Sequence, residues 1–488
     1  MRCTLPSYQD MLQAVRAGQL AGRRIEGVTD RSFDVARGWV FVARQGQHVD
    51  GIAYAQEAVA RGAVAVVAEQ PLSLRVPSVL VQDADRALGH LAAAFVGDPC
   101  DRLEVVGITG TNGKTTTAAL LSHVMRQGGR RIGTIGTLGV QLDGELMRPL
   151  GLTTPAAPEL QAALRELVER GAQAVVMEVS SHALRQRRTA GCSFDVAVFT
   201  NWTRDHTDYH GDMQHYLEAK GLLFSGLSQQ DRPALAVLNR DSPAFDYLRS
   251  VTAVPVRTFG QDGDVRLLDW QDDGVAGGRG EVEVDGERHA LVLRLPGSYN
   301  VENALAALTA ATGMGIGPAD VLQRISELRS VAGRMHIIEA HGPQRRIVID
   351  YAHNPAGLLQ LLRFARRTSQ GRVIAVFGGR GERDRGKRPL MGAIAAALAD
   401  RLVVTIDNPR GEDPMQTALE VAAGARESGI PTDIVLDRYE AIRRALALAG
   451  PGGTVTITGK GAETWDERHE GQSMTDILAV QSLIEPAL

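Results

Sequence analysis

The sequence predicts an α/β protein built from three domains. At 488 residues the chain exceeds what one hydrophobic core supports, and about three domains follow from the usual size of a domain. Short apolar runs alternate with helix-length segments, the pattern of mainly parallel sheets covered by helices. We expect a small N-terminal α/β domain at 1–100, a central domain with a mainly parallel sheet at 101–332 and a C-terminal Rossmann-like α/β domain at 333–488.

Each domain has its own set of expected elements. In the first domain, apolar runs predict strands at Trp39–Ala43, Ala63–Ala68 and Val79–Val81. Alanine-rich segments predict helices at Tyr54–Arg61 and Ala87–Val96. In the second we expect strands at Leu103–Ile108, Ala174–Val179, Val196–Thr200 and Ala234–Asn239, hairpins and loops at 260–288, and a helix at Val301–Ala311. The third has expected strands at Arg345–Asp350, Val373–Gly378, Arg401–Ile406 and Thr454–Thr458, ending in polar loops where open parallel sheets bind ligands.

Composition limits the partners and the compartment. The net charge is −4, 23% of residues are charged and 5% are aromatic, which gives no electrostatic case for nucleic acid or an anionic membrane. The N-terminus lacks the apolar core of a signal peptide, and no run reaches the ~18 apolar residues of a membrane span. Three scattered cysteines, Cys3, Cys100 and Cys192, form neither a disulfide framework nor a zinc pattern. We expect a cytoplasmic protein without membrane insertion, and a monomer.

A glycine-rich loop follows the first strand of the central domain. It reads Gly110, Thr111, Asn112, Gly113, Lys114, Thr115 and Thr116, and a helix follows. The glycines let backbone N–H groups approach phosphate oxygens at the helix N-terminus, Lys114 adds a charge for the β- and γ-phosphates, and Thr115 offers a hydroxyl to Mg²⁺. An ordinary glycine turn would not explain the Lys-Thr pair. Position 108 is isoleucine where the strict motif has glycine, so we expect a variant ATP-binding phosphate loop.

Two further segments of the central domain are dense in ionisable groups. Glu178 ends a strand before Ser180, Ser181 and His182, and we interpret it as a carboxylate for magnesium rather than a solvated acid. The segment 200–210 contains two histidines, two aspartates and an arginine, of which Asp205 and His206 are the strongest candidates for metal or phosphate contacts. Lys220 would by default be a helix-surface lysine.

Polar residues also end the strands of the third domain. Asp350 and His353 follow one strand, and a basic loop at 380–388 follows the next. Asp407, Asn408, Pro409 and Arg410 follow another, where the planar fork of Arg410 suits a carboxylate. In the central domain, Asn300 and Asn303 begin a helix either as caps or as amides for an adenine edge.

Five motifs together resemble the Mur ligases. They are Thr-Gly-Thr-Asn-Gly-Lys-Thr-Thr (109–116), Glu-Val-Ser-Ser-His (178–182), Thr-Asn-Trp-Thr-Arg-Asp-His (200–206), Asp-Tyr-Ala-His (350–353) and Gly-Lys-Arg-Pro-Leu-Met-Gly (386–392). The resemblance spans nearly the whole chain. It implies a ligase of peptidoglycan synthesis, which uses ATP and Mg²⁺ to convert the terminal carboxylate of a UDP-linked muramoyl dipeptide into an acyl phosphate and joins it to meso-2,6-diaminopimelate.

The same resemblance implies roles for individual residues. Lys114, Glu178, His206 and Lys220 would be catalytic, with Lys220 carbamylated and binding the metal together with Thr115 and Glu178. Asn300, Asn303, Arg334 and Asp350 would surround the adenosine. The UDP-muramoyl dipeptide would be held by Ser32, Thr153, Thr154, Ser180, Gln186 and Arg188. The amino acid would contact His353, Arg383, Asp407, Asn408, Pro409, Arg410, Gly459 and Glu463, with an arginine for its distal carboxylate and Glu463 for its distal ammonium.

Departures from the family pattern leave alternatives open. Phe33 stands where an arginine is expected, Ala462 where a histidine is expected, and Asn354 replaces the commoner threonine. A paralogue using the same ATP chemistry on another carboxylate and amine, such as L-lysine or a specialised-metabolite substrate, is therefore the second hypothesis. A phosphate-loop switch or motor protein is the third, but it would not need Glu178, Lys220 or the 407–410 segment.

Overall fold

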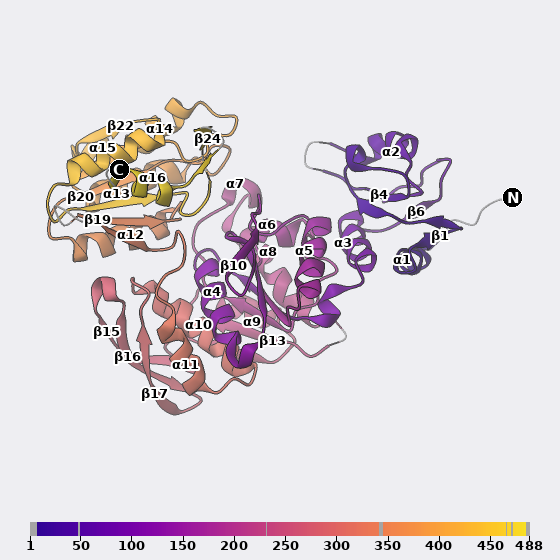
Figure 1. Ribbon diagram of the computed structural model, residues 1–488, viewed down its shortest axis with the longest axis horizontal. Helices are drawn as coiled ribbons and strands as arrows, with labels where there is room; N and C mark the ends of the chain where they lie inside the picture. Colours follow the sequence, from indigo (N-terminus) through magenta and orange to yellow (C-terminus); the bar gives the residue numbers. More distant parts are fainter. Residues whose placement is uncertain are drawn as a thin grey trace.

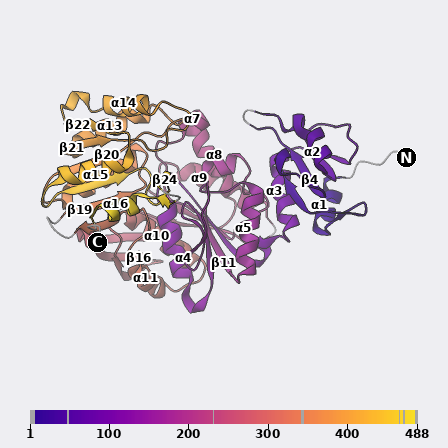
Figure 2. The same cartoon turned by 45° about the horizontal axis from the view of Figure 1, so that its top comes forward.

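Three sheets rich in parallel strands succeed one another along the chain in the computed structural model (Figure 1). The structure describes residues 7–46, 49–230, 232–340, 345–464, 466–469 and 472–484. The expected α/β class is confirmed. Figures 1 and 2 both show the N-terminal and C-terminal units on opposite sides of the central one.

The N-terminal unit contains a four-stranded parallel sheet in the order β3-β4-β5-β6. Its strands are β3 (Gly27–Thr29), β4 (Trp39–Ala43), β5 (Ala65–Ala68) and β6 (Ser78–Leu80), and its helices are α1 (Tyr8–Arg16), α2 (Ala55–Arg61) and α3 (Ala84–Phe95). A short antiparallel pair, β1 (Gln19–Leu20) and β2 (Arg23–Arg24), precedes them. Apolar side chains of β4 alternate between two cores, because Val40 and Val42 pack toward α1 and α3 and Phe41 packs toward α2.

An eleven-stranded sheet forms the central unit, in the order β10-β9-β8-β11-β7-β12-β13-β14-β15-β16-β17. Neighbouring strands are parallel from β8 through β11, β7, β12, β13 and β14 to β15. The strands at the two edges, β9 and β10 on one side and β16 and β17 on the other, pair antiparallel. In chain order the strands are β7 (Glu104–Thr109), β8 (Ile132–Gly136), β9 (Gly139–Leu142), β10 (Glu145–Arg148), β11 (Ala174–Glu178), β12 (Val196–Phe199), β13 (Leu235–Asn239), β14 (Val256–Phe259), β15 (Val265–Asp272), β16 (Gly278–Val284) and β17 (Glu287–Leu293).

Helices cover both faces of this sheet. They are α4 (Lys114–Met125), α5 (Ala157–Glu169), α6 (Ser181–Arg185), α7 (Thr207–His210), α8 (Met213–Leu227), α9 (Phe245–Ser250), α10 (Tyr299–Gly313) and α11 (Pro318–Glu327). One core lies under α4, α10 and α11, and the other under α5 and α8. The segment expected as decorating hairpins instead continues the main sheet, since β15 pairs with β14 and its two antiparallel partners extend the edge.

The C-terminal unit is a six-stranded sheet in the order β18-β19-β23-β20-β21-β22, parallel except for β18. Its strands are β18 (His336–Ala340), β19 (Arg345–Asp350), β20 (Val373–Phe377), β21 (Arg401–Val404), β22 (Thr432–Ile434) and β23 (Thr454–Thr458). Its helices are α12 (Pro355–Thr368), α13 (Lys387–Leu398), α14 (Pro414–Ala423), α15 (Arg438–Ala449) and α16 (Asp476–Ile484). A small ribbon, β24 (Asp466–His469) and β25 (Gln472–Met474), precedes α16.

Contacts from the long central hairpin support this third unit. The turn between β15 and β16 lies against α12, where Arg367 Nη2 is 2.6 Å from the Asp272 carboxylate and Val275 joins the apolar cluster of Leu361 and Phe364. The hairpin therefore fixes α12 from below in the view of Figure 1.

Two expectations from the composition concern the cysteines and membrane-spanning segments. Cys100 and Cys192 come together beside α5 as free thiols, whereas Cys3 lies outside the described residues. Within the described ranges, no helix is long and apolar enough to cross a membrane.

Candidate active site

The glycine-rich loop occupies the turn between β7 and α4, at the centre of the largest sheet. Gly110 and Gly113 have φ angles of 148° and 86°, a region that side chains other than glycine's rarely adopt. A Cβ atom at Gly110 would collide with Thr200 Oγ1, and one at Gly113 with Asn303 Oδ1. The loop is therefore held on both sides, and α4 begins directly after it with its N-terminus at Lys114.

Lys114 folds back over this loop. Its Nζ atom donates to the carbonyl oxygens of Gly110 and Thr111, each at 2.9 Å. Burial lowers the pKa of Lys114 below its usual value, while the carboxylate of Glu178 opposes that shift. The two carbonyl groups therefore hold the Lys114 ammonium at the loop, where it is available to bind a phosphate.

Glu178 ends β11, the strand beside β7, and its carboxylate faces the loop. Thr115 Oγ1 lies 3.0 and 2.9 Å from the two carboxylate oxygens, and the Thr137 backbone N–H donates at 2.8 Å. Only 2% of Glu178 is exposed. A buried carboxylate and a hydroxyl are hard oxygen donors that fit Mg²⁺, although in the described ranges no three His, Cys, Asp or Glu residues converge as a ready-made metal cluster.

The segment after β12 buttresses the loop. Thr200 Oγ1 donates to the Asn112 carbonyl at 2.6 Å, and the Asn201 side chain accepts from Asn112 N at 2.9 Å. His206 has an unusual positive φ of 55°, and burial lowers the pKa of its imidazole well below the usual value. The neutral ring stacks edge-on against His182.

Asp205 has protein partners rather than an open carboxylate. Lys387 Nζ lies 3.1 Å from Oδ1, and Asn354 Nδ2 donates to Oδ2 at 3.1 Å. The ring of His353 approaches Oδ2 at 3.4 Å. Burial opposes ionisation of Asp205, but Lys387 helps to hold its pKa well below the usual range. These contacts make Asp205 a link between the central unit and the C-terminal one, and its contact with a metal or phosphate stays a prediction.

Lys220 is not the surface lysine of the default interpretation. It lies in α8 with 1% of its surface exposed, and its Nζ atom sits 4.3 Å from the ring centroid of Tyr216. Burial, and then the charge of Lys114, lower the pKa of Lys220 well below its usual value. This shift favours the neutral amine, which is the reactive form for carbamate formation.

Lysine usage supplies a signal that our sequence reasoning missed. The chain contains 53 lysines and arginines, and only Lys114, Lys220, Lys387 and Lys460 are lysines. Lys220, Lys387 and Lys460 are buried and Lys114 is folded onto the loop. Since arginine serves at every exposed cationic position, a lysine marks a place where a compact ammonium or a neutral amine is needed. This pattern singles out Lys387 and Lys460, which were not among the expected site residues.

Five residues expected to hold the UDP-linked substrate form one hydrogen-bond network beside Glu178. Thr154 Oγ1 donates to the Glu178 carbonyl at 2.8 Å and accepts from Ser180 N at 3.0 Å. Arg188 donates to the Thr154 carbonyl and to Gln186 Oε1, at 2.9 and 2.6 Å. Thr153 reaches the network through Thr137, with 3.2 Å between the hydroxyl oxygens.

Ser32 lies apart, in the N-terminal unit. Its hydroxyl donates to Glu57 at 3.3 Å. Beside it Phe33 is 64% exposed, with the Arg31 guanidinium 5.9 Å from its ring centroid. Phe33 stands where an arginine is expected, but Arg31, two positions earlier, keeps a cation on this surface.

The residues expected around the adenosine lie where the second and third units meet. Asn303 Nδ2 donates to Asn300 Oδ1 at 2.9 Å, and both are buried inside α10, whose cap position is Ser298; they are not caps. Arg334 Nη2 donates to Thr115 Oγ1 at 2.8 Å. Asp350 accepts from the backbone N–H groups of Met335 and Ala352, both at 2.8 Å, and so orients the segment that carries Arg334.

The loops expected to hold the amino acid converge at the carboxyl ends of β19, β20, β21 and β23. Arg383 faces Asp208 at 3.7 Å, and Arg410 and Asn408 are exposed, Arg410 with a positive φ of 49°. The backbone of Pro409 and Asn408 lies under the loop of Gly381, whose N–H donates to the Asn408 carbonyl at 2.8 Å. His353 is oriented by the Tyr351 carbonyl, 3.0 Å from Nδ1.

Asp407 and Glu463 are already paired within the protein. Arg380 Nε donates to Asp407 Oδ2 at 2.9 Å, and Arg380 Nη2 donates to the Gly459 carbonyl at 2.8 Å and to Glu463 Oε2 at 3.2 Å. Burial opposes ionisation of Asp407, yet Arg380 holds the pKa of that carboxyl below its usual range. Tyr351 OH donates to the second carboxylate oxygen of Glu463. Sequence reasoning gave Arg380 and Tyr351 no specific role.

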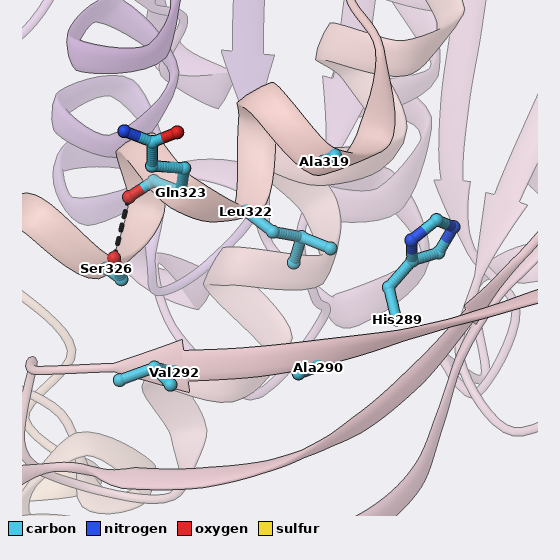
Figure 3. A pocket seen from close by; sticks show the side chains of 7 residues that line it. All are labelled: His289, Ala290, Val292, Ala319, Leu322, Gln323 and Ser326. Carbon is cyan, nitrogen blue, oxygen red and sulfur yellow. Dashed lines mark hydrogen bonds between the residues drawn. The ribbon is translucent and has the colours of Figure 1, made fainter.

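Two hollows in the described part of the structure have different surroundings. A small cavity between the central and C-terminal units is lined by Thr137, Leu138, Ala332, Gly333, Arg334, Tyr351, Ala462 and Glu463. It joins the surroundings of Glu178 to the amino-acid loops. A larger hollow of about 280 Å³ lies between β17 and α11, where Figure 3 shows His289 and Leu322 near each other, and its lining includes none of the expected site residues.

Family models match three successive parts of the chain. Residues 24–96 match the Mur ligase family catalytic domain, 108–311 the Mur ligase middle domain, and 333–461 the Mur ligase glutamate ligase domain. The chain belongs to the Mur ligase family. Membership makes it an ATP-dependent acid–amino-acid ligase and excludes the switch or motor hypothesis.

Curated relatives cover most of the chain. A UDP-N-acetylmuramoyl-L-alanyl-D-glutamate–2,6-diaminopimelate ligase of Geobacillus kaustophilus is 42% identical over 88% of both chains. The protein of the same name from Aquifex aeolicus is 38% identical over 91% of this chain and 90% of its own. A solved structure of a ligase with this name superposes with a TM-score of 0.67 at 31% identity, covering 97% of this chain and 98% of the other.

The fold is also shared with other solved ligases. MurF ligase of Thermotoga maritima in complex with ADP superposes with a TM-score of 0.59 at 22% identity, over 89% of this chain and 93% of the other.

Proposed function

We propose that this chain adds meso-2,6-diaminopimelate to UDP-N-acetylmuramoyl-L-alanyl-D-glutamate, with ATP as the energy source, in peptidoglycan synthesis. The names of the relatives at about 40% identity support these substrates. The observation that carries the chemistry is the contact between the two units that would hold the reactants. Arg334 reaches Thr115 at 2.8 Å and Asn354 reaches Asn112 at 3.0 Å, so the amino-acid loops close directly over the phosphate loop.

The proposed reaction has two bond-forming steps, as the resemblance to the family implies. A carboxylate oxygen of the dipeptide attacks the γ-phosphorus of ATP, and the bond to the bridging oxygen of ADP breaks to give an acyl phosphate. The amine of the amino acid then attacks the acyl carbon, the bond to the phosphate oxygen breaks, and the nitrogen loses a proton. Lys114 and the backbone N–H groups of the phosphate loop neutralise the charge that develops on the phosphates.

Magnesium would be held by three residues, of which Thr115 and Glu178 are in direct contact. Thr115, Glu178 and a carbamylated Lys220 supply hydroxyl and carboxylate oxygens, the ligands that Mg²⁺ prefers. When bound, the ion neutralises phosphate charge and polarises the phosphoryl group. Neutral His206 lies beside Asp205, so its imidazole would help to position the Asp205 carboxylate and would add no positive charge to the site.

The three units would hold different parts of the substrates. The network of Thr153, Thr154, Ser180, Gln186 and Arg188 sits beside Glu178 and would place the dipeptide carboxylate, with Ser32 toward the UDP end. Buried Asn300 and Asn303, with Arg334 and Asp350, would border the nucleotide. The exposed Arg410 and the partly buried Arg383 would bind the carboxylates of the amino acid. We further propose domain boundaries near residues 100 and 332, a cytoplasmic location and a monomer.

One assay tests the proposal. Purified protein is incubated with ATP, Mg²⁺, UDP-N-acetylmuramoyl-L-alanyl-D-glutamate and either meso-diaminopimelate or L-lysine, and phosphate release and product mass are measured. We expect a tripeptide product with diaminopimelate and at least 100-fold lower kcat/KM with lysine, which lacks a distal carboxylate for an arginine. Turnover with lysine alone would favour the paralogue hypothesis, and no turnover with either would refute the proposed substrates.

A further inference from the structure

An arginine of the protein pairs with Glu463, which was expected to bind the second amine of the substrate, and with Asp407, which was expected to contact the amino acid. Arg380 follows β20 and turns toward the ends of β21 and β23. Through its Nε and Nη2 atoms it contacts Asp407, the Gly459 carbonyl and Glu463, three of the positions expected to contact the amino acid. Its side chain is only 18% exposed, so this is an internal ion pair rather than a surface contact.

Neighbouring groups fix the arginine in this position. The guanidinium carbon lies 4.9 Å from the ring centroid of Tyr351, whose hydroxyl donates to Glu463. Asp407 is fully buried, and its second oxygen has Lys460 Nζ at 3.9 Å. Glu463 is therefore occupied at both oxygens, one by Tyr351 and the other by Arg380.

The charge balance of this corner is close to neutral before any substrate binds. Asp407 and Glu463 carry two negative charges, and Arg380 and Lys460 carry two positive ones. An added ammonium would face Arg380 at short range, and like charges placed together in a desolvated site disfavour binding. An added carboxylate would instead find Arg383 and Arg410, whose charges interact with each other in the loops after β20 and β21.

We propose that Arg380 is a specificity-determining residue that takes the place of the substrate's distal ammonium at Asp407 and Glu463. The pocket then recognises its amino acid by a second carboxylate and not by a second amine. The substrate class is an α-amino acid with a distal carboxylate, whether or not that end also carries an ammonium. This inference deepens the proposed function and depends on it.

The test compares two amino acids that differ only in the distal amine. The full-length enzyme is assayed with ATP, Mg²⁺ and the UDP-linked dipeptide, using either meso-diaminopimelate or 2-aminopimelate as the acceptor. The measured quantity is the ratio of the two kcat/KM values. Replacing Arg380 frees the two carboxylates, so in Arg380→Ala we expect the preference for diaminopimelate over 2-aminopimelate to rise at least tenfold.

Matched variants separate specificity from folding. Arg380→Lys keeps the charge and should leave the ratio within about threefold of the wild-type value, whereas Arg380→Gln should raise it as alanine does. Arg385→Ala is the control, because that arginine belongs to the same loop but is 65% exposed and pairs with Glu412. The KM for ATP in each variant reports whether the rest of the site is intact.

Opposite results lead to different conclusions. If wild-type enzyme turns over diaminopimelate and the ratio in both neutral variants is unchanged or lower, Arg380 does not stand in for the ammonium and the inference is wrong. If wild-type enzyme uses neither acceptor with the UDP-linked dipeptide, the proposed function itself fails. A ratio that rises in Arg380→Ala and Arg380→Gln but not in Arg380→Lys or Arg385→Ala supports the inference.

Discussion

At the scale of single residues, burial decides what the lysines of this chain do. Exposed cationic positions are arginines, whereas Lys220, Lys387 and Lys460 are buried and Lys114 is folded onto the phosphate loop. An arginine stays charged in any environment, whereas a buried lysine loses its proton readily. The lowered pKa of Lys220 is thus a consequence of its place in α8 under Tyr216 and next to Lys114.

Lys220→Ala should lower kcat at least 100-fold. The neutral amine attacks CO₂, a C–N bond forms and a proton leaves, so that a cation becomes an anionic oxygen ligand for magnesium. Formate or acetate should partly restore activity in the alanine variant by supplying the missing carboxylate. In ¹³C-bicarbonate, wild-type enzyme should give a carbamate signal in NMR that the variant lacks. Full activity of Lys220→Ala would show that no carbamate is required.

At the scale of elements, most strands near the site could be predicted from the sequence. Continuous apolar runs such as Val196–Phe199 and Val373–Phe377 are strands buried on both faces, and their polar successors mark the loops. The sequence reasoning did not identify β8 to β10, because Ile132–Arg148 mixes glycine and charge with apolar residues at an antiparallel edge. The hairpins at 260–288 were expected as decoration, since pairing with β14 is a long-range contact without a local signal.

The candidate site, too, could be predicted from the sequence only in part. The phosphate loop, Glu178 and the 200–210 segment are visible in the sequence because their residues are contiguous. The partners of Asp205 are not, since Lys387 and Asn354 are 182 and 149 residues away. Resemblance to a family identifies positions that touch substrates, but a contact between two protein side chains, such as Arg380 with Glu463, becomes visible only in the fold.

The buried ion pair between the segment after β12 and helix α13 should control closure of the third unit. Asp205→Asn and Lys387→Met should each lower kcat about 100-fold, because each leaves an uncompensated buried group. The double variant should be no worse than either single one, since the pair acts as a unit. Steady-state kinetics gives the coupling, and small-angle X-ray scattering should show a larger radius of gyration in the single variants.

A surface pair provides the control for this cycle. Arg443 and Glu440 are 2.6 Å apart in α15 with side chains 60% and 46% exposed, so Arg443→Ala should change kcat little. Additive losses for Asp205 and Lys387, with an unchanged radius of gyration, would contradict the closing role of the pair.

At the scale of the whole molecule, the central unit connects the other two, and partly buried histidines occur in all three units. Among the described residues, seven histidines have a lowered pKa, with burial as the leading cause in each case: His90, His123, His182, His206, His210, His336 and His353. Burial lowers the pKa of His182 to about 3 and that of His210 to about 4. Three of the seven, His182, His206 and His210, pack together with Tyr209 and Tyr216 beside Lys220.

Acidification from pH 7.5 to pH 5.5 should therefore destabilise the protein. A histidine whose folded pKa is lowered binds a proton in the unfolded chain below about pH 6.5 but not in the folded one, so the free energy of unfolding falls as pH falls. After discounting for partial exposure, His182 contributes on the order of 1 kcal/mol over this range. Carboxylates with lowered pKa, such as Asp205, act in the same direction only below about pH 4. The decrease in Tm across this range should be smaller in His182→Gln, and His215→Gln, at an exposed position in α8, should behave as wild type. A Tm that is constant or rises on acidification would mean that these imidazoles are charged in the fold.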